Sequence, residues 1–336
     1  MKPGAVQEVG RVKHGGSEDA GLIDFSANVS PRIPEGVSEV YENALEKSRR
    51  YPQDPPYGFG DSVSEYLDCP PENVVPTPGG LAALRLAIET NVADGDHVLV
   101  PAPSFSEYGR EVRLQGAVPD YVPHDRILDL NPSGYSLAII CNPNNPTGEI
   151  YDRERLLGFA RDCRRSNTTL LVDEAFLGFT REESLAGTAG VIVARSLTKI
   201  FGLPGIRMGF CVSSGDLLDR LLKARRTWNV GRPAVEVAKY CLGKDDFVAE
   251  TRNRVESERR RMRKVLSKCY GVHPSQSPFF LLNVGSRSVA DLVSEARRRG
   301  VAVRDATSFR RLGSHVRVAV RLTRENDRLL EVPTDV

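Results

Sequence analysis

The chain has 336 residues, with 46 Lys and Arg against 44 Asp and Glu, which gives a formal net charge of +2. This near-balance gives no reason to expect nucleic acid or an anionic membrane as the main partner. With 40% hydrophobic and 27% charged residues, the composition excludes a disordered or fibrous chain and suits a globular protein with one large and one smaller domain.

Signals for export, membrane insertion and metal binding are weak throughout the sequence. No apolar run approaches the roughly 20 residues needed to span a bilayer, and the N-terminus lacks the apolar core of a secretory signal. The six cysteines are dispersed without a C-x-x-C pair, and the five histidines are equally scattered. We therefore expect a cytoplasmic protein with reduced thiols and no metal.

Residues 1–40 form the first predicted unit, an N-terminal arm with the short apolar stretch LIDFSANVSP. We expect this arm to pack against the C-terminal part of the chain. A helix is predicted over residues 34–50, and it ends at the proline-rich segment RRYPQDPPYG.

Between residues 41 and 229, apolar strands alternate with helices predicted over 79–92, 105–115 and 152–165. This alternation predicts an α/β fold with a mainly parallel central sheet that is covered on both faces. Functional groups of such sheets gather at the carboxyl ends of the strands. The predicted strands lie in the segments HVLVPAP, AVPDYV, LAIIC, TTLLVDEA, VIVARS and RMGFCVS.

Residues 230–336 change in character and predict a small α+β domain. A long basic helix over 245–268 precedes FFLLNV, a helix over 288–299, the strands VAVR and HVRVAV, and a short helix from about Thr323. The basic run RNRVESERRRMRKVLSK could indicate a nucleic-acid-binding helix. Interleaved Glu256 and Glu258 favour a solvated helix face instead, so we expect no nucleic-acid partner.

Two segments after predicted strands carry candidate chemical groups. In SLTK and GIRMG, Lys199 stands beside the hydroxyls of Ser196 and Thr198, and Arg207 follows eight residues later. Such a lysine can form a Schiff base next to a phosphate clamp, although a solvated loop lysine is the more common case. In VDEAF, Asp173 can pair with the pyridinium nitrogen of pyridoxal phosphate, or it can be a helix cap or a surface acid.

Two turns complete the set of candidate segments. CNPNNPTG is a rigid turn in which Asn145 could donate to a phenolic oxygen of a cofactor, unless the turn is purely structural. TPGGLAAL leads into a helix, and the backbone N–H groups of Gly80 and Leu81 suit a phosphate. No Lys-Ser or Lys-Thr follows the glycines, so this turn is not a P-loop.

Together and in this order, the four segments resemble the aspartate-aminotransferase superfamily of pyridoxal-phosphate enzymes, and the resemblance covers nearly the whole chain. It implies fold type I, with a large domain over 41–229, a small domain over 230–336, and residues 1–40 as an arm and part of the small domain. It implies pyridoxal 5'-phosphate attached to Lys199 as a Schiff base. The cofactor-binding residues that it implies are Gly80, Leu81, Phe105, Asn145, Asp173, Ser196, Thr198, Lys199 and Arg207.

The resemblance also bears on assembly and on one departure from the family pattern. Tyr51, in RRYP, is similar to a tyrosine that reaches the cofactor phosphate of the neighbouring subunit, which implies a homodimer with shared active sites. Many relatives have tyrosine where Phe176 stands. The missing hydroxyl is expected to alter the electronics of the cofactor without abolishing its binding.

Two branches of the superfamily fit, histidinol-phosphate aminotransferase and threonine-phosphate decarboxylase, and both act on phosphorylated amino compounds. HGG with DFSANVSP, PSFSEYGR, DEAF, TWNVGRPA and HVRVAVRLTRENDRLL look more like the decarboxylase, although Gly231 departs from its pattern. Arg317 and Arg321 are four residues apart on a predicted strand, so we expect them to share a face. The resemblance implies His14, Asn28, Arg304 and Arg317 as substrate-binding residues, and the shared face adds Arg321.

The resulting hypothesis is decarboxylation of L-threonine O-3-phosphate to (R)-1-aminopropan-2-yl phosphate for cobalamin, with Lys199 as the catalytic residue. His14 and Arg304 would hold the phosphate so that the carboxylate stands upright over the ring and leaves as CO2. The alternative is a histidinol-phosphate aminotransferase that transfers the amino group to 2-oxoglutarate. A catalytically dead regulator would require loss of Lys199 or Asp173, and both are present. Threonine phosphate and serine phosphate remain undistinguished, because one methyl group contributes only about 1–3 kcal/mol.

Overall fold

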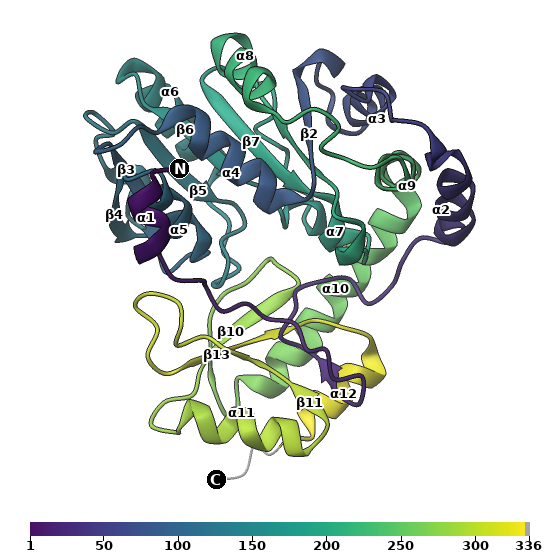
Figure 1. The fold of residues 1–336 in the computed structure, drawn as a ribbon. Coiled ribbons are helices and arrows are strands. Elements are labelled where there is room, and N and C mark those ends of the chain that lie inside the picture. Colours follow the sequence, from purple (N-terminus) through teal and green to yellow (C-terminus); the bar gives the residue numbers. More distant parts are fainter. Residues whose placement is uncertain (333–336) are drawn as a thin grey trace.

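The computed structural model describes residues 1–332 and places a seven-stranded sheet in the upper part of the molecule (Figure 1). The strand order is β2-β8-β7-β6-β5-β3-β4, and β8 runs antiparallel to both neighbours while the other pairings are parallel. The predicted α/β fold with a mainly parallel sheet is confirmed. The strands are β2 (Val74–Thr77), β3 (His97–Ala102), β4 (Val118–Pro123), β5 (Leu137–Cys141), β6 (Thr169–Asp173), β7 (Val191–Ser196) and β8 (Gly209–Val212).

The large sheet is buried on both faces because its central strands are apolar at consecutive positions. Along β5, Leu137, Ile139 and Cys141 join a core with α4 (Gly80–Asn91), α5 (Glu107–Leu114) and α8 (Gly215–Ala224). Ala138 and Ile140 alternate with them and join a second core with α6 (Arg153–Arg165). Because side chains alternate along a strand, each central strand packs against a helical layer on both faces of the sheet. The polar residues at the strand ends then lie at one edge of the sheet.

A second, antiparallel sheet forms the lower part of the molecule, in the order β12-β13-β10-β9. Figure 1 shows α10, α11 and α12 beside it, and β10 contributes the buried run from Phe279 to Leu282. The elements are β9 (Gly271–Val272), β10 (Phe279–Asn283), β12 (Arg304–Asp305), β13 (His315–Ala319), α10 (Asp245–Leu266), α11 (Val289–Arg298) and α12 (Thr323–Leu330).

The N-terminal arm contacts both parts of the molecule (Figure 1). Strand β1 (Ile23–Asp24) pairs in parallel with β11 (Val301–Ala302), next to the small sheet. Helix α1 (Pro3–Glu8) lies instead by α5, where the Lys2 backbone N–H donates to the Leu114 carbonyl at 2.8 Å. The expectation that all of residues 1–40 pack on the C-terminal part is therefore wrong for the first helix.

Strand β2 and two helices near the end of the large sheet were not predicted from the sequence, whereas the helix predicted over residues 34–50 is present as α2. Strand β2 is only four residues long and contains Pro76, so it carries no clear strand pattern. Helix α2 (Val37–Glu46) packs against α9 (Arg232–Leu242), and α9 also packs against α3 (Tyr57–Leu67). These contacts join segments that are almost 200 residues apart in the sequence.

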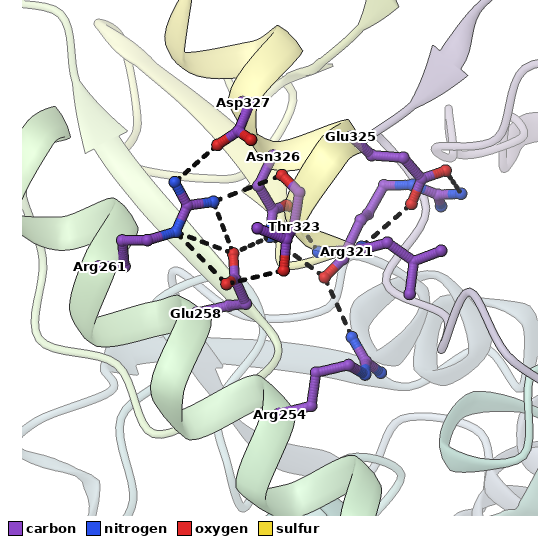
Figure 2. A network of polar contacts seen from close by, with 9 residues as sticks. Arg254, Glu258, Arg261, Arg321, Thr323, Glu325, Asn326 and Asp327 are labelled. Atoms are coloured by element: carbon purple, nitrogen blue, oxygen red, sulfur yellow. Dashed lines mark hydrogen bonds and ion pairs between the residues drawn. The ribbon is translucent and has the colours of Figure 1, made fainter.

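Part of the basic run of α10 is paired with local carboxylates. Figure 2 shows Arg261 between Glu258, at 2.7 Å, and Asp327 of α12, at 2.6 Å. The buried Glu258 also accepts a hydrogen bond from the Asn326 side chain at 2.7 Å. This network fastens α12 to α10, so these charges serve the packing of the small part. Within residues 1–332, no helix is both long and apolar enough to cross a membrane.

A histidine cluster lies where the small sheet meets the turn after β5. His273 and His315 approach each other at 3.2 Å between their Nε2 atoms, and His124 contacts the Glu149 carboxylate at 2.7 Å. Burial lowers the pKa of His273; the charge of Glu149 opposes this shift, and that of His124 adds to it. The pKa of His315 is also lowered, by burial and by the neighbouring His273. Protonating both rings would place two cations side by side.

We expect the stability of the protein to fall as the pH drops through about 6.5, the ordinary value of histidine. The unfolded chain takes up these protons first, because the folded-state pKa values of His273 and His315 are depressed. His273→Gln/His315→Gln should therefore lose less of its thermal midpoint between pH 7.5 and 5.5 than the parent protein. His97→Gln, at an exposed histidine, is the control. Equal losses in all three proteins would contradict the assignment.

Candidate active site

An inner cavity of about 340 Å3 lies at the carboxyl ends of the large-sheet strands, between that sheet, the small sheet and the arm. Most of the predicted site residues line it, although segments as far apart in the sequence as His14 and Arg317 contribute to it. The predicted residues in its lining are His14, Asn28, Leu81, Phe105, Asn145, Lys199, Arg207, Arg304 and Arg317, and Phe176 joins them.

Lys199 projects into this cavity from α7 (Leu197–Ile200), a single turn that directly follows β7. Burial, together with the charges of Arg317 and Arg207, lowers the pKa of Lys199 to about 8, while Asp173 acts in the opposite direction. A lysine with this pKa has an appreciable neutral fraction near neutral pH. It can therefore act both as a nucleophile and as a proton carrier.

Asp173 ends β6 and is buried, with two hydrogen-bond donors on its carboxylate. Tyr108 donates its hydroxyl at 2.6 Å, and the Ala175 backbone N–H donates at 3.0 Å. Burial raises the pKa of Asp173, while these two hydrogen bonds and Lys199 lower it. A buried carboxylate of this kind is a ready partner for a cationic ring nitrogen.

Tyr108 contacts Asp173 but was not among the site residues predicted from the sequence. It lies on α5, is fully buried, and reaches Asp173 across 65 positions of the chain. Its place just after β3 was the only signal available in the sequence. We infer that it positions the Asp173 carboxylate.

Tyr108→Phe should weaken binding of the expected cofactor by about tenfold, because a hydrogen bond to a charged group contributes about 1.5–3 kcal/mol. The loss is measured as the dissociation constant of pyridoxal phosphate. Tyr151→Phe is the matched control, since its hydroxyl donates at 2.7 Å to the His124 carbonyl and not to Asp173. Unchanged affinity in Tyr108→Phe would contradict the positioning role.

The geometry at the start of α4 fits a phosphate. Gly79 has φ +92°, and a Cβ there would lie 3.0 Å from the Arg207 guanidinium carbon. A Cβ at Gly80 would lie 2.9 Å from the Ser196 Cβ. The two glycines therefore allow the helix N-terminus, the arginine and the Ser196 hydroxyl to lie close together. The hydroxyls of Ser196 and Thr198 are hydrogen-bonded to each other at 2.9 Å.

Arg317 is buried and lines the cavity. Within the described chain, its hydrogen-bond partners are all neutral polar groups. Its guanidinium donates to the Asn145 side chain at 2.5 Å and to the Ser26 carbonyl at 2.9 Å. With the Asn28 amide oxygen turned toward it, Asn28 accepts from Nε and Nη1 at 3.2 Å. Burial and the neighbouring Arg304 lower the pKa of Arg317 to about 9. A cation held in this way is suited to an incoming anion.

Arg304 and His14 approach the cavity from the side of the arm. Arg304 is also buried, and its Nη2 donates to the Lys13 carbonyl at 2.5 Å and to the Ser308 hydroxyl at 2.8 Å. The His14 ring contacts the buried Glu107 carboxylate at 2.8 Å. The arm is therefore fastened over the site by groups that also face the cavity.

Two predicted site residues lie elsewhere. Arg321 does not line the cavity, because β13 ends at Ala319 and the expected common face with Arg317 is lost. Its guanidinium donates to the Asp24 carbonyl at 3.0 Å. It also donates to the Glu325 carboxylate at 2.9 Å (Figure 2). Tyr51 is 77% exposed and stacks on Trp228 at 4.5 Å between ring centroids. Its role toward a second subunit stays a prediction.

The family model described as aminotransferase class I and II matches residues 41–332. The chain therefore belongs to the class I and II aminotransferase family. The cofactor of this family is pyridoxal 5'-phosphate. The residues around Lys199 fit it, since the cradle at Gly79 and Gly80 can take its phosphate and Asp173 its ring nitrogen.

Similarity to individual proteins divides between two activities. Histidinol-phosphate aminotransferase 2 of Archaeoglobus fulgidus is 28% identical over 95% of this chain and 94% of its own. A putative threonine-phosphate decarboxylase of Caldanaerobacter subterraneus is 29% identical over 91% of this chain and 88% of its own. The crystal structure of L-threonine-O-3-phosphate decarboxylase from Porphyromonas gingivalis superposes with a TM-score of 0.84 and 24% identity, over 92% and 97% of the two chains.

Proposed function

We propose that the chain is a pyridoxal-phosphate-dependent decarboxylase that converts L-threonine O-3-phosphate into (R)-1-aminopropan-2-yl phosphate for the cobalamin side chain. The observation that carries the choice of a phosphorylated substrate is the group of cationic donors in the inner cavity. Arg304 and Arg317 are 5% and 6% exposed, and in the described chain their hydrogen bonds go to neutral groups. A substrate with a phosphate and a carboxylate supplies the missing negative charge.

The residues of the cavity would act by orienting this substrate. When bound, pyridoxal phosphate supplies an electron sink for the electron pair that remains at Cα after a bond there breaks. Arg304 and His14, with Arg317 as a neighbouring donor, would hold the substrate phosphate, and the carboxylate would be free to stand out of the ring plane. The buried Phe176 would exclude water from this region. Lys199 would then deliver a proton to Cα.

Several observations favour decarboxylation over amino transfer. The Caldanaerobacter relative carries the decarboxylase name. The arm, whose HGG segment resembles that branch, places His14 in the lining of the inner cavity. The apolar Phe176 stands at the position where many aminotransferases have tyrosine.

A second candidate is histidinol-phosphate aminotransferase, with 2-oxoglutarate as amino acceptor. Relatives with that name outnumber the decarboxylase among the similar curated proteins. Both candidate reactions need a clamp for a substrate phosphate, so Arg304 and Arg317 support both and do not distinguish between them.

We further propose a homodimer in which Tyr51 reaches the cofactor phosphate of the neighbouring subunit. Tyr51 and Trp228 are 77% and 51% exposed and form one stacked aromatic pair on the surface. Exposed aromatic pairs of this kind are commonly covered in an assembly.

The proposal is tested by incubating the holoenzyme with O-phospho-L-threonine in the absence of a keto acid. We expect CO2 and aminopropanol phosphate to form in equal amounts over many turnovers. Formation of a keto acid without CO2, or turnover that requires 2-oxoglutarate and histidinol phosphate, would overturn the decarboxylase and favour the second candidate.

A further inference from the structure

A second, outer cavity of about 700 Å3 adjoins the inner one. It lies between the arm, the ends of β3 and β4, and the loop over residues 306–313 that connects β12 to β13. The two cavities are adjacent, because they share the lining residues Val12, Lys13, Phe105, Ser106 and Phe309. A ligand in the outer cavity would therefore lie next to the candidate active site.

The lining of the outer cavity is strongly cationic. Among the described residues that line it none is acidic, although the whole chain is almost neutral. Two carboxylates are adjacent in sequence to lining residues, Glu107 beside Ser106 and Asp120 beside Tyr121, but neither lines the cavity. Glu107 contacts His14 and Asp120 contacts His97. The cationic residues in the lining are Arg11, Lys13, Arg113, Arg310 and Arg311.

Two of the guanidinium groups are fixed by one aromatic side chain. Arg310 lies over the Tyr121 ring, 3.9 Å from its centroid, and Arg113 donates to the Tyr121 hydroxyl at 3.0 Å. Neither contact neutralises the positive charge. The wall therefore presents two oriented forks, the geometry that suits the oxygen atoms of a phosphate.

Arg311 adds an independent observation. Its φ of +70° lies in the left-handed region, where glycine is favoured and a long side chain is strained. The backbone of the loop therefore does not account for an arginine at this position. Arg311 therefore adds a further positive charge to the lining of the outer cavity, at a backbone conformation that disfavours a long side chain.

We propose that the outer cavity is a second phosphate-binding site, distinct from the clamp at Arg304 and Arg317. Several cations facing one concave region raise the local concentration of anions, and guanidinium groups bind phosphate oxygens in pairs. The phosphate can belong to the substrate on its way to the inner cavity, or it can be free inorganic phosphate. The inference rests on the proposed function only in naming a phosphorylated substrate as one source.

The first experiment measures binding of inorganic phosphate to the holoenzyme by equilibrium dialysis at low ionic strength. We expect two phosphates per chain, and loss of one in Arg310→Ala/Arg311→Gly. The glycine relieves the strain at φ +70°, so this variant should fold. The control removes the same charge from the exposed Arg126 and Arg165, which line neither cavity, by substitution to alanine, and should keep both phosphates. The same stoichiometry in the parent and in the outer-cavity variant would overturn the site.

The second experiment distinguishes the two sources of phosphate. If the substrate binds the outer cavity, kcat/KM for O-phospho-L-threonine should fall by about tenfold in Arg310→Ala/Arg311→Gly at low ionic strength, with a flatter salt dependence and little change in kcat. If kcat/KM is unchanged while one phosphate is lost in dialysis, the site takes free phosphate. Because dialysis needs no turnover, a chain that fails to decarboxylate its substrate can still confirm or overturn the outer site.

Discussion

Lys199→Ala is expected to lower turnover by at least about 10⁴-fold, because it removes the group that we propose as both the nucleophile and the proton carrier of the site. Lys199 lines the inner cavity, and burial with two nearby arginines lowers its pKa to about 8. Activity is measured in the presence of excess pyridoxal phosphate, so that weaker cofactor binding does not account for the loss. Treatment with borohydride should leave cofactor attached to the parent chain and not to the variant.

Lys199→Arg is the matched variant for this test. It keeps a cation in the cavity, but a guanidinium group stays protonated at accessible pH and is a poor nucleophile. Equal inactivity of the two variants would assign the effect to the neutral amine. Substantial turnover in either one would show that another group carries the chemistry.

Arg317→Met is expected to impair activity and stabilise the fold at the same time. The side chain is buried beside neutral groups, and burial together with Arg304 lowers its pKa to about 9, so the folded protein carries this charge at a cost. Methionine should raise the free energy of unfolding by about 1–2 kcal/mol, after the loss of hydrogen bonds to Asn145 and Ser26 is included. The same change should lower kcat/KM by about 10²–10⁴-fold, because the substrate anion loses a buried cationic partner.

Arg195→Met is the control for the stability effect. Arg195 is also buried, but it pairs with the buried Glu174 at 2.9 Å. Its removal leaves an uncompensated carboxylate and should destabilise the protein by about 3–5 kcal/mol. Chemical unfolding of the two variants should therefore give shifts of opposite sign. A strongly destabilised Arg317→Met would mean that Arg317 serves mainly the fold.

The central strands could be predicted from the sequence because their apolar runs are unbroken and end at turn residues. The run from Val191 to Ser196 forms β7 as expected, and the residues after β5, β6 and β7 meet at one sheet edge. Strand β2 is short and contains Pro76, so local pattern did not reveal it. The fold class could therefore be predicted from the hydrophobic periodicity. Elements that depend on contacts with distant segments could not be predicted from it.

The candidate site was predicted in part, since residue type and spacing identify groups but not their neighbours. Arg321 fell outside the cavity because strand alternation was extended two residues beyond the end of β13. The contact of Tyr108 with Asp173 depends on how α5 packs on the sheet. The outer cavity joins the arm, β4 and a loop near the C-terminus, which only the tertiary fold brings together.

The most direct test of the proposed decarboxylation uses O-phospho-L-threonine labelled with ¹⁴C in its carboxyl group. The holoenzyme, without a keto acid, should release the label as CO2 continuously, in step with aminopropanol phosphate, and Arg304→Met should slow both to the same extent. The contradicting result is a keto acid that retains the label. Its formation would stop at an amount equal to the cofactor and would resume only when 2-oxoglutarate is added, which would assign the site to amino transfer.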